Sequence, residues 1–395
     1  MIQIKEKQKC CGCTACYNIC PKQAIKMEED IEGFKYPKVN VDLCIDCSLC
    51  EKVCPIKNST CDNKKVLKSY VVRTKKNNLK EATSGGFFYP LANSILNKNG
   101  YVYGVIFDKK DKKIKHIEVN NEDDLRLMNG SKYVQSDLLD IFSKIKKKLN
   151  SGKYVLFSGT PCQCEGLKKF LQKNFEKLIM VDVICHGVPS PKLWEKYVDF
   201  QEKKYKSSII DVNFRNKTYG YHSGTMKLVF KNKKIYYGSA RVDIMLKSFF
   251  KEISSRPSCY KCSFKKEVHE TDFTIFDAWN ASKLNSQVKE DDKGYTNVFI
   301  NTEKGKKIFD DISNMYEYYE TNYLRAIELD GIMVKNSAVA HPDRKEFYKD
   351  LNCNDGIKKI KKNYLKNKIT DYIIEKSKKI LYKTKILHCV KKLRG

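Results

Sequence analysis

The sequence predicts an α/β protein in which a small cysteine-rich α+β domain precedes a larger mixed α/β domain. Two cysteine-rich runs lie within the first 55 residues, and from about residue 66 strand-like and helix-like segments alternate. The 395 residues exceed the needs of the small domain by more than 300, which is enough for a second sizeable core. We therefore expect domains at residues 1–60 and 66–350, followed by a basic helical extension at 351–395.

The two cysteine runs share one spacing, C-x2-C-x2-C-x3-C-P. The first run contains Cys10, Cys13, Cys16 and Cys20 before Pro21, and the second contains Cys44, Cys47, Cys50 and Cys54 before Pro55. This is the pattern of bacterial two-cluster ferredoxins, in which the fourth cysteine of each run reaches the other cluster. The sequence therefore predicts one 4Fe-4S cluster on Cys10, Cys13, Cys16 and Cys54, and another on Cys20, Cys44, Cys47 and Cys50.

Zinc and disulfides fit these cysteines less well. A zinc ribbon uses four ligands in two pairs with a longer spacer, whereas this region offers eight spaced thiols. Disulfides are disfavoured because such close thiols cannot pair without strain, and the chain opens with no apolar stretch like that of a signal peptide. Cys11 and Cys61 are left over, and we expect them to be free thiols.

The net charge of +29 is unevenly distributed. Residues 1–60 carry 9 lysines and 8 acidic residues, whereas residues 356–395 carry 14 basic and 2 acidic residues. Nucleic acid, an anionic membrane surface or an acidic partner could use this charge, and solvated lysine-rich helix faces are the alternative. No nucleic-acid-binding motif accompanies the charge, so we expect no nucleic acid.

Membrane contact is expected to be peripheral at most. No window approaches the ~18 consecutive apolar residues of a membrane span, and oxygen-sensitive clusters favour the cytoplasm. The C-terminal extension could form an amphipathic helix on anionic lipid at the inner face of the membrane, or a docking helix, or a lysine-coated tail. Its apolar residues are Ile369, Tyr372, Ile373, Ile380, Leu381 and Ile386.

The expected elements of the larger domain begin after a polar linker at residues 58–68. Apolar patterns predict strands at Lys68–Arg73, Tyr101–Phe107 and Ile114–Val119, and helices at Ser84–Asn97 and Asp137–Leu149. Next come a strand at Tyr154–Phe157, a turn at 158–161, a helix from about Cys162 to Lys173, a strand at Leu178–Ile184 and a helix from about Pro191. This order favours parallel strands.

Four more cysteines follow predicted strands or lie in a loop. Cys162 and Cys185 each come just past a strand, at the edge where open α/β sheets build their sites. Cys259 and Cys262 lie between a predicted helix at Asp243–Ile253 and a strand at Phe273–Phe276. These four could bind a third cluster, although buried free thiols are also common. Cys164 is an alternative to Cys162, but it lies further into its helix.

Several phrases resemble one protein family. They are SGGFF at 84–88, GSKYVQSD at 130–137, SGTPCQ at 158–163, CHGVPSP at 185–191 and SCYKCSF at 258–264. They are similar to the family of beta subunits of the deazaflavin (coenzyme F420) hydrogenases and dehydrogenases. The resemblance runs from the ferredoxin module to about residue 350, in an arrangement often seen in polysaccharide-biosynthesis gene neighbourhoods. Family members are iron-sulfur flavoproteins, and their relatives include ferredoxin-dependent pigment reductases and an electron-input module of a sulfite reductase.

The resemblance implies a third 4Fe-4S cluster on Cys162, Cys185, Cys259 and Cys262, and FAD in a flavin-binding domain. Ser84-Gly85-Gly86 are expected to open a helix, where free N–H groups suit a phosphate, or else to form a simple cap in a tight loop. No G-x-G-x-x-G follows a strand, so a nicotinamide site is not indicated. The expected flavin contacts are Thr83, Ser84, Gly85, Gly86, Lys132, Tyr133 and Gln135.

The function expected from these features is a cytoplasmic oxidoreductase that relays electrons between its clusters and FAD for an unidentified substrate. Its partner would be ferredoxin, another electron carrier or a small redox coenzyme. Since the chain carries its own two-cluster domain, electrons can pass without a deazaflavin.

Three residues are candidates for proton delivery beside the flavin: His186, His222 and Asp277. Each has a structural alternative: His186 lining the cluster, His222 in an exposed loop, and Asp277 capping a turn. A non-enzymatic electron carrier or adaptor, and an iron-sulfur protein that binds nucleic acid, are the other function classes considered.

Overall fold

A computed structural model describes residues 1–58, 65–75, 79 and 81–384. The predicted linker lies partly outside these residues, and Cys61 and Ile386 lie wholly outside them. None of the helices in the described part of the chain combines the length and the apolar composition needed to cross a bilayer.

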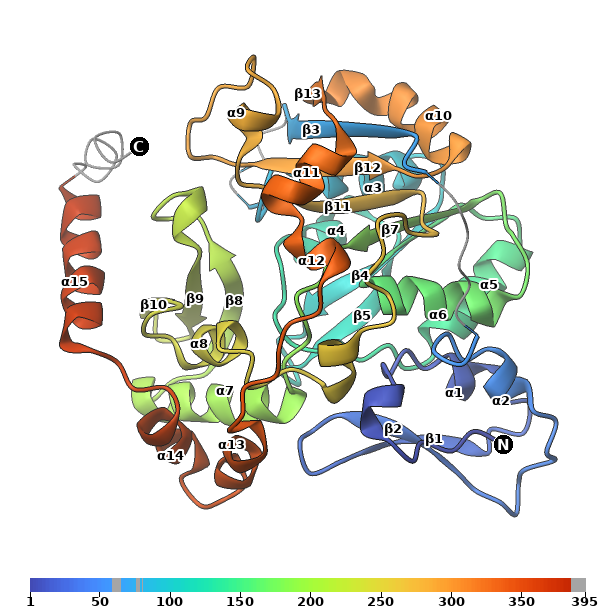
Figure 1. The fold of residues 1–395 in the computed structure, drawn as a ribbon, viewed down its shortest axis with the longest axis horizontal. Coiled ribbons are helices and arrows are strands. Elements are labelled where there is room, and N and C mark those ends of the chain that lie inside the picture. Colours follow the sequence, from blue (N-terminus) through green and yellow to red (C-terminus); the bar gives the residue numbers. More distant parts are fainter. Residues whose placement is uncertain (59–64, 76–78, 80, 385–395) are drawn as a thin grey trace.

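The N-terminal domain pairs a short hairpin with two short helices (Figure 1). Its elements are η1 (Lys7–Lys9), α1 (Ala15–Ile19), β1 (Ile25–Glu29), β2 (Lys35–Val39) and α2 (Leu49–Lys52). The two cysteine loops share a backbone conformation, because Gly12 and Thr14 in the first run and Asp46 and Ser48 in the second all have positive φ. These left-handed residues turn each loop tightly enough for its first three cysteines to face one point.

The larger domain is built on an eight-stranded mixed sheet, which confirms the predicted α/β class. Its strands, in spatial order, are β13 (Tyr316–Glu320), β3 (Lys68–Thr74), β12 (Tyr295–Ile300), β11 (Phe273–Ala278), β7 (Leu178–Val183), β6 (Val155–Gly159), β4 (Tyr101–Phe107) and β5 (Ile114–Val119). The predicted parallel order is confirmed for β4, β6, β7 and β11, and the outer strands are antiparallel.

Helices cover both faces of this sheet because the central strands are apolar on both sides. On one face, α3 (Phe88–Leu96) and α10 (Glu303–Ile312) pack on Val102, Leu156 and Ile179. On the other, α5 (Ile141–Asn150) and α6 (Pro161–Leu171) pack on Val155 and Leu178. Shorter elements join the strands: α4 (Glu122–Leu125), η3 (Arg126–Met128), α9 (Ala281–Leu284), η6 (Ser313–Met315), α11 (Tyr323–Asp330) and α12 (Ile332–Lys335).

A second, three-stranded antiparallel sheet was not predicted. It contains β8 (Ile209–Asn216), β9 (Thr225–Phe230) and β10 (Ile235–Ser239) in the order β10-β9-β8, with η4 (Tyr221–Ser223) between β8 and β9. Around it lie α7 (Pro191–Tyr205), α8 (Ile244–Phe250), α13 (Arg344–Leu351) and α14 (Gly356–Asn363), and beyond them α15 (Ile369–Lys383) (Figure 1). The short helix η5 (Pro257–Lys261) contacts η1 of the N-terminal domain. Within the predicted extension at 351–395, Ile357 and Ile360 of α14 are buried in the same core as Trp194.

Two predicted helix starts are wrong for identifiable reasons. The helix expected from Asp137 starts at Ile141, because Asp137 bonds through its backbone to Ile114 and His116 at the edge of the sheet. The helix expected from Ser84 starts at Phe88. Other predicted strands and helices of the larger domain are found within a few residues of their expected limits.

The N-terminal domain packs on the larger domain through α1 and its cysteine loop. Cys11, Cys13 and Ala15 share a buried cluster with Phe142 of α5 and Leu167 of α6. Gly166 of α6 permits this approach, since a Cβ at this position would lie 2.7 Å from the Cys13 Cβ. The first cysteine loop therefore lies against α5 and α6, the helices that follow β5 and β6 (Figure 1).

Candidate redox site: three cysteine-lined pockets

The first pocket lies in the N-terminal domain next to the larger domain. Its lining includes Cys10, Cys13, Cys16 and Cys54, which is one of the two sets expected from the sequence. The first three thiols come from the loop around Gly12, and Cys54 follows α2 at the end of the second run. The ferredoxin spacing predicts that the fourth cysteine of each run joins the other run's cluster, and Cys54 of the second run does line the pocket of the first run.

The second pocket lies on the far side of the same domain. It is lined by Cys20, Cys44, Cys47 and Cys50, the other expected set, and Cys47 is exposed. Backbone N–H groups point at its sulfurs: Ala24 donates to the Cys20 Sγ at 3.3 Å, and Ile2 donates to the Cys50 Sγ at 3.3 Å. Hydrogen bonds of this kind tune the reduction potential of a bound cluster.

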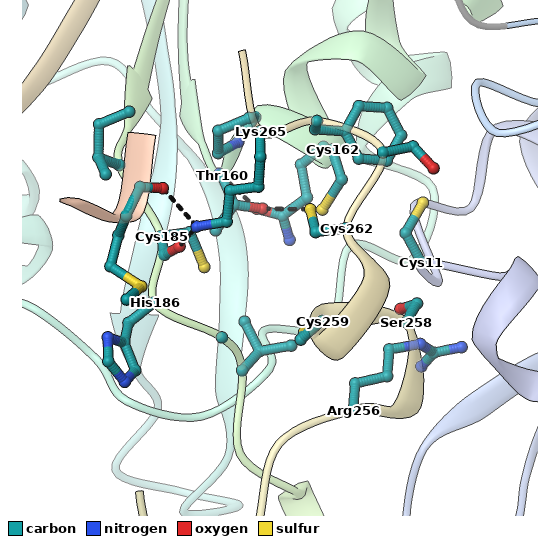
Figure 2. Close-up of a pocket in the computed structure, with 18 of the residues that line it drawn as sticks. Cys11, Thr160, Cys162, Cys185, His186, Arg256, Ser258, Cys259, Cys262 and Lys265 are labelled. Carbon is teal, nitrogen blue, oxygen red and sulfur yellow. Dashed lines mark hydrogen bonds between the residues drawn. The ribbon is translucent and has the colours of Figure 1, made fainter. Parts of the chain in front are cut away.

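The third pocket lies in the larger domain at the carboxyl ends of parallel strands. Cys162, Cys185, Cys259 and Cys262 all line it, and their side chains come from three different segments (Figure 2). Cys162 is in the first turn of α6, and Cys185 follows β7 by two residues. Cys259 is in η5, and Cys262 comes directly after this helix.

Local sequence explains how Cys162 is positioned. Thr160 and Gln163 form a capping box at the start of α6, and Pro161 occupies the first turn. The helix therefore begins directly after β6, which holds Cys162 at the edge of the sheet. The Thr160 hydroxyl also lies 3.2 Å from the Cys162 Sγ. Cys164 lies outside the pocket, with its thiol toward the carbonyl of Val181 in β7 at 3.8 Å.

The third pocket is an apolar environment for its thiols. Burial raises the pKa of Cys185 to about 12 and that of Cys262 to about 11, and it also raises the pKa of Cys259. Without a metal these thiols stay protonated near neutral pH, whereas iron ligation deprotonates a cysteine outright. A cluster would therefore supply the positive charge that four buried thiolates need. Within the described residues, no three His, Cys, Asp or Glu side chains converge closely enough for a single metal ion.

Cys11 lies between the first and third pockets and lines both of them. It was expected to be a free thiol, and it forms no disulfide. Its thiol nonetheless lies near those of Cys13 and Cys162, one from each pocket. Figure 2 shows Cys11 on a segment of the N-terminal domain facing the pocket of the larger domain.

Three residues of the third pocket were not anticipated from the sequence. Lys265 donates from its Nζ to the Cys185 carbonyl oxygen at 2.5 Å. His269 pairs through Nδ1 with Asp182, and its buried Nε2 has no hydrogen-bond partner among the described residues. Arg256 reaches from the pocket to Cys10. The one available signal was proximity in sequence, because Arg256 and Lys265 flank the Cys259–Cys262 pair within three residues.

Two of the expected flavin contacts at 83–86 form hydrogen bonds with strand β12 of the large sheet. The Ser84 hydroxyl donates to the Tyr295 carbonyl oxygen, and the Gly85 N–H donates to the Thr296 Oγ1 at 2.9 Å. A Cβ at Gly85 would lie 2.2 Å from the Val72 carbonyl oxygen, so glycine is required here by close packing. These residues do not open α3, which corrects the expectation of a helix start with a free Gly85 N–H.

The other expected flavin contacts lie in the adjoining 130–135 segment. Thr83 joins the two segments, because its Oγ1 accepts a hydrogen bond from the Ser131 N–H at 2.8 Å. The Lys132 Nζ donates to three carbonyl oxygens, and burial lowers its pKa to about 7. The Tyr133 ring stacks on Phe249, with 4.8 Å between centroids. Gln135 lines the third pocket.

The three candidates for proton delivery fall into two places. His186 lines the third pocket and pairs with Glu252. Asp277 accepts hydrogen bonds from the Arg215 guanidinium and from the Tyr221 hydroxyl, the latter at 3.1 Å, and His222 is exposed beside Tyr221. Asp277 therefore acts first as the counter-ion of a buried arginine. The Nη2 of this Arg215 is buried and has no hydrogen-bond partner in the described part of the chain.

Comparison with known proteins finds two matching families and several relatives. Residues 152–324 match the family described as coenzyme F420 hydrogenase/dehydrogenase, C terminus of the beta subunit, and residues 9–58 match the 4Fe-4S dicluster domain. The F subunit of the F(420)H(2) dehydrogenase of Methanosarcina mazei is 20% identical over 372 residues, which cover 90% of this chain and 97% of that protein.

Two further matches concern the first domain and a solved structure. The pyruvate synthase subunit PorD of Thermotoga maritima is 45% identical over 56 residues, which cover 14% of this chain and 52% of PorD. A chain in the structure of the F420-reducing NiFe hydrogenase complex from Methanosarcina barkeri is 18% identical, with a TM-score of 0.45, over 76% of this chain and 91% of that chain.

Proposed function

Since residues 152–324 of this chain belong to the family of coenzyme F420 hydrogenase/dehydrogenase beta subunits and residues 9–58 form a 4Fe-4S dicluster domain, we propose that the protein is an iron-sulfur flavoprotein oxidoreductase. It relays electrons along three 4Fe-4S clusters between a partner and FAD. The observation that carries this proposal is the arrangement of twelve candidate ligand cysteines in three pockets, four in each, with Cys11 lining two of the pockets in addition.

The order of the pockets supports a relay. The second pocket has the exposed Cys47 and so lies within reach of an external electron carrier. The first and third pockets are neighbours, because both are lined by Cys11 and Ile56. Electrons would pass from the second pocket through the first to the third, or in the reverse direction.

The third cluster is proposed on Cys162, Cys185, Cys259 and Cys262. Four half-buried cysteines around one pocket are the donor set of a 4Fe-4S cluster. The N–H or lone pair of the unpartnered His269 Nε2 would face this cluster, and Asp182 holds the imidazole through Nδ1. Such a buried imidazole is well placed to bond to a cluster sulfur and tune its potential.

FAD is proposed beside the third pocket, against Tyr133 and Arg215. When bound, a flavin couples single-electron transfer to two-electron chemistry. Among the described residues, the buried Nη2 of Arg215 has no hydrogen-bond partner, and the guanidinium lies 4.3 Å from the Trp279 ring centroid and near Tyr133. A guanidinium here would stabilise negative charge on a reduced ring. His186, held by Glu252 at the edge of the third pocket, is the proposed proton donor, and His222 is the alternative.

The partner is proposed to be a ferredoxin-like carrier or a small redox coenzyme. The names of the relatives make coenzyme F420 one candidate for that coenzyme. The proposed organic substrate is a precursor in polysaccharide biosynthesis, the class that the sequence resemblance suggests. A stopped-flow assay with reduced ferredoxin and with reduced F420 distinguishes the carriers, because only the true donor reduces the clusters rapidly.

Peripheral contact with an anionic membrane is proposed for α15. Ile369, Ile373 and Ile380 are exposed on this basic helix at helical spacing. The protein should cosediment with vesicles containing anionic lipid and not with neutral vesicles. Equal recovery with both would remove this part of the proposal.

A paired substitution tests the third cluster. Cys185→Ala removes one proposed ligand, so the iron content should fall from about twelve to about eight atoms per chain while the signals of the first two clusters remain. Cys164→Ala is the matched control, because this buried cysteine lies in the same region but outside the pocket. The third cluster is refuted if both variants keep the iron content of the unmodified protein.

A non-enzymatic electron carrier or adaptor is the second candidate. The occupied Gly85 N–H and Ser84 hydroxyl favour it, because they remove two groups that were expected to bind the flavin. This candidate predicts protein that contains iron but takes up no FAD from solution. The flavoprotein predicts tight uptake that Arg215→Gln weakens.

A further inference from the structure

Arg256 of the larger domain inserts its side chain into the N-terminal domain beside Cys10. The residue is 1% exposed, and its Nη2 lies 3.6 Å from the Cys10 Sγ. Its Nε donates to the Cys10 carbonyl oxygen at 2.7 Å, its Nη1 to the Gln135 Oε1 at 3.0 Å, and its Nη2 also to the Lys35 carbonyl oxygen at 3.0 Å. The guanidinium is thus fixed on a cysteine of the first pocket.

The backbone of Arg256 belongs to the third pocket. Its N–H donates to the Val188 carbonyl oxygen at 3.0 Å, and its carbonyl oxygen accepts a hydrogen bond from the Cys259 N–H at 2.9 Å. The turn that presents Cys259 therefore also directs this side chain toward Cys10. Figure 2 shows Arg256 on the segment next to Cys259, on the side of the pocket where Cys11 lies.

The charge of Arg256 has no carboxylate partner among the described residues. Its hydrogen-bond acceptors are two carbonyl oxygens, one amide oxygen and one sulfur, and its guanidinium lies 4.2 Å from the Tyr36 ring centroid. A buried cation without an anion is strongly unfavourable. The thiolate of Cys10, as part of an anionic four-thiolate cluster, supplies the missing negative charge.

In the part of the chain that the structure describes, no buried cation donates a hydrogen bond to a sulfur of the second pocket. The Met1 ammonium and Lys22 line this pocket, but the ammonium is paired with Asp46 and Glu51. The hydrogen bonds to Cys20 and Cys50 come from neutral backbone N–H groups of Ala24 and Ile2. Hydrogen bonds and positive charge at cluster sulfurs stabilise the more negative, reduced state and so raise the reduction potential. The two clusters of the N-terminal domain therefore sit in different electrostatic environments, and the larger domain creates the difference.

We propose that Arg256 is a positioning residue that raises the reduction potential of the cluster on Cys10 above that of the cluster on Cys20. One electron then leaves the outer cluster, which is oxidised, and enters the inner cluster, which is reduced, with no bond made or broken. The larger domain thereby directs electrons toward itself. This inference rests on the dicluster domain and requires neither the third cluster nor FAD.

The test is a redox titration of the full-length protein, monitored by electron paramagnetic resonance, for Arg256→Gln and Arg256→Lys. A hydrogen bond to a charged group is stronger than one between neutral groups. At the potential that half-reduces the unmodified inner cluster, Arg256→Gln should lower the ratio of reduced to oxidised cluster about tenfold, or ~59 mV for one electron. Arg256→Lys keeps the charge and should shift less.

Arg344→Gln is the matched control. Arg344 also bridges the two domains, donating to Glu32 and to the Ser255 carbonyl oxygen, but it contacts no cluster sulfur among the described residues. Its loss should leave both potentials unchanged. The proposal is supported if Arg256→Gln retains its iron content and lowers the reduction potential of the cluster on Cys10 alone. An unchanged potential in Arg256→Gln, equal shifts of both centres, or an equal shift in Arg344→Gln overturns it. If Arg256→Gln fails to assemble its clusters, Arg256→Lys decides the test. A tenfold fall in the ratio of reduced to oxidised inner cluster in Arg256→Lys then overturns the proposal.

Discussion

Cys11 lines one cysteine pocket of each domain, the first pocket and the third. Its thiol lies near one cysteine of each neighbouring pocket, yet four other cysteines line each of those pockets. We therefore expect Cys11 to pack between the first and third pockets without binding iron. Cys11→Ala should keep the full iron content, measured after anaerobic purification. A loss of about four iron atoms would instead make Cys11 a ligand.

Acid stability depends on another single residue, His116. It is buried, its Nε2–H donates to the Ser158 carbonyl oxygen at 3.1 Å, and burial lowers its pKa to about 4. Since the unfolded histidine titrates near 6.5, the unfolded chain binds more protons between pH 6.5 and 4, and stability falls as the pH falls through this window.

A urea-denaturation series tests this dependence. Between pH 7 and pH 5, His116 should account for a loss on the order of 2 kcal/mol in the free energy of unfolding. His116→Gln should therefore lose less stability over this range than the unmodified protein. The exposed His222 is the control, and His222→Gln should keep the original pH dependence. Identical behaviour of the two variants would contradict the account.

At the level of residues, the sequence predicts the grouping of cysteines better than the roles of polar side chains. The pockets gather the cysteines in the expected sets because ligand spacing is a local property of tight loops. Arg256 and His269 could not be found in this way, since their contacts with Cys10 and Asp182 join distant segments. The roles of His186, His222 and Asp277 stay predictions.

At the level of elements, helix caps decide where the third-pocket cysteines lie. Thr160 caps α6 and also contacts the Cys162 thiol, whereas Thr302 caps α10 on the opposite face of the sheet. Each substitution by valine should cost about 1 kcal/mol of stability. Only Thr160→Val should also alter the electronic spectrum of the third cluster. If the two variants have the same spectrum, the contact between Thr160 and Cys162 does not affect the third cluster, and the prediction is contradicted.

The accuracy of the predicted elements follows from how local their signals are. The strands β4 and β5 have the expected limits because β4 is apolar along its whole length and β5 has apolar residues at both ends and in its middle. The start of α3 was misplaced because small residues at 84–86 resemble a cap, while their real role is to pass close to β3 and β12. The sheet β10-β9-β8 was missed because its strands mix charged and apolar residues and pair only with one another.

At the level of the whole molecule, the two domains form a line of three cysteine pockets. The contacts that hold this line are Phe34 against Tyr348, Arg344 with Glu32, and the cysteine loop against α5 and α6. No local signal in the sequence predicts such an arrangement, because each contact joins residues more than a hundred positions apart. The combination of a dicluster domain with the hydrogenase/dehydrogenase domain is nevertheless readable from the motifs alone.

The most direct test of the central claim is the content of iron, acid-labile sulfide and FAD in the full-length protein purified without oxygen. Three 4Fe-4S clusters and a flavin site predict about twelve iron atoms, about twelve sulfides and one FAD per chain. About eight iron atoms and no flavin, even after reconstitution with added iron, sulfide and FAD, would contradict the relay and leave a two-cluster electron carrier.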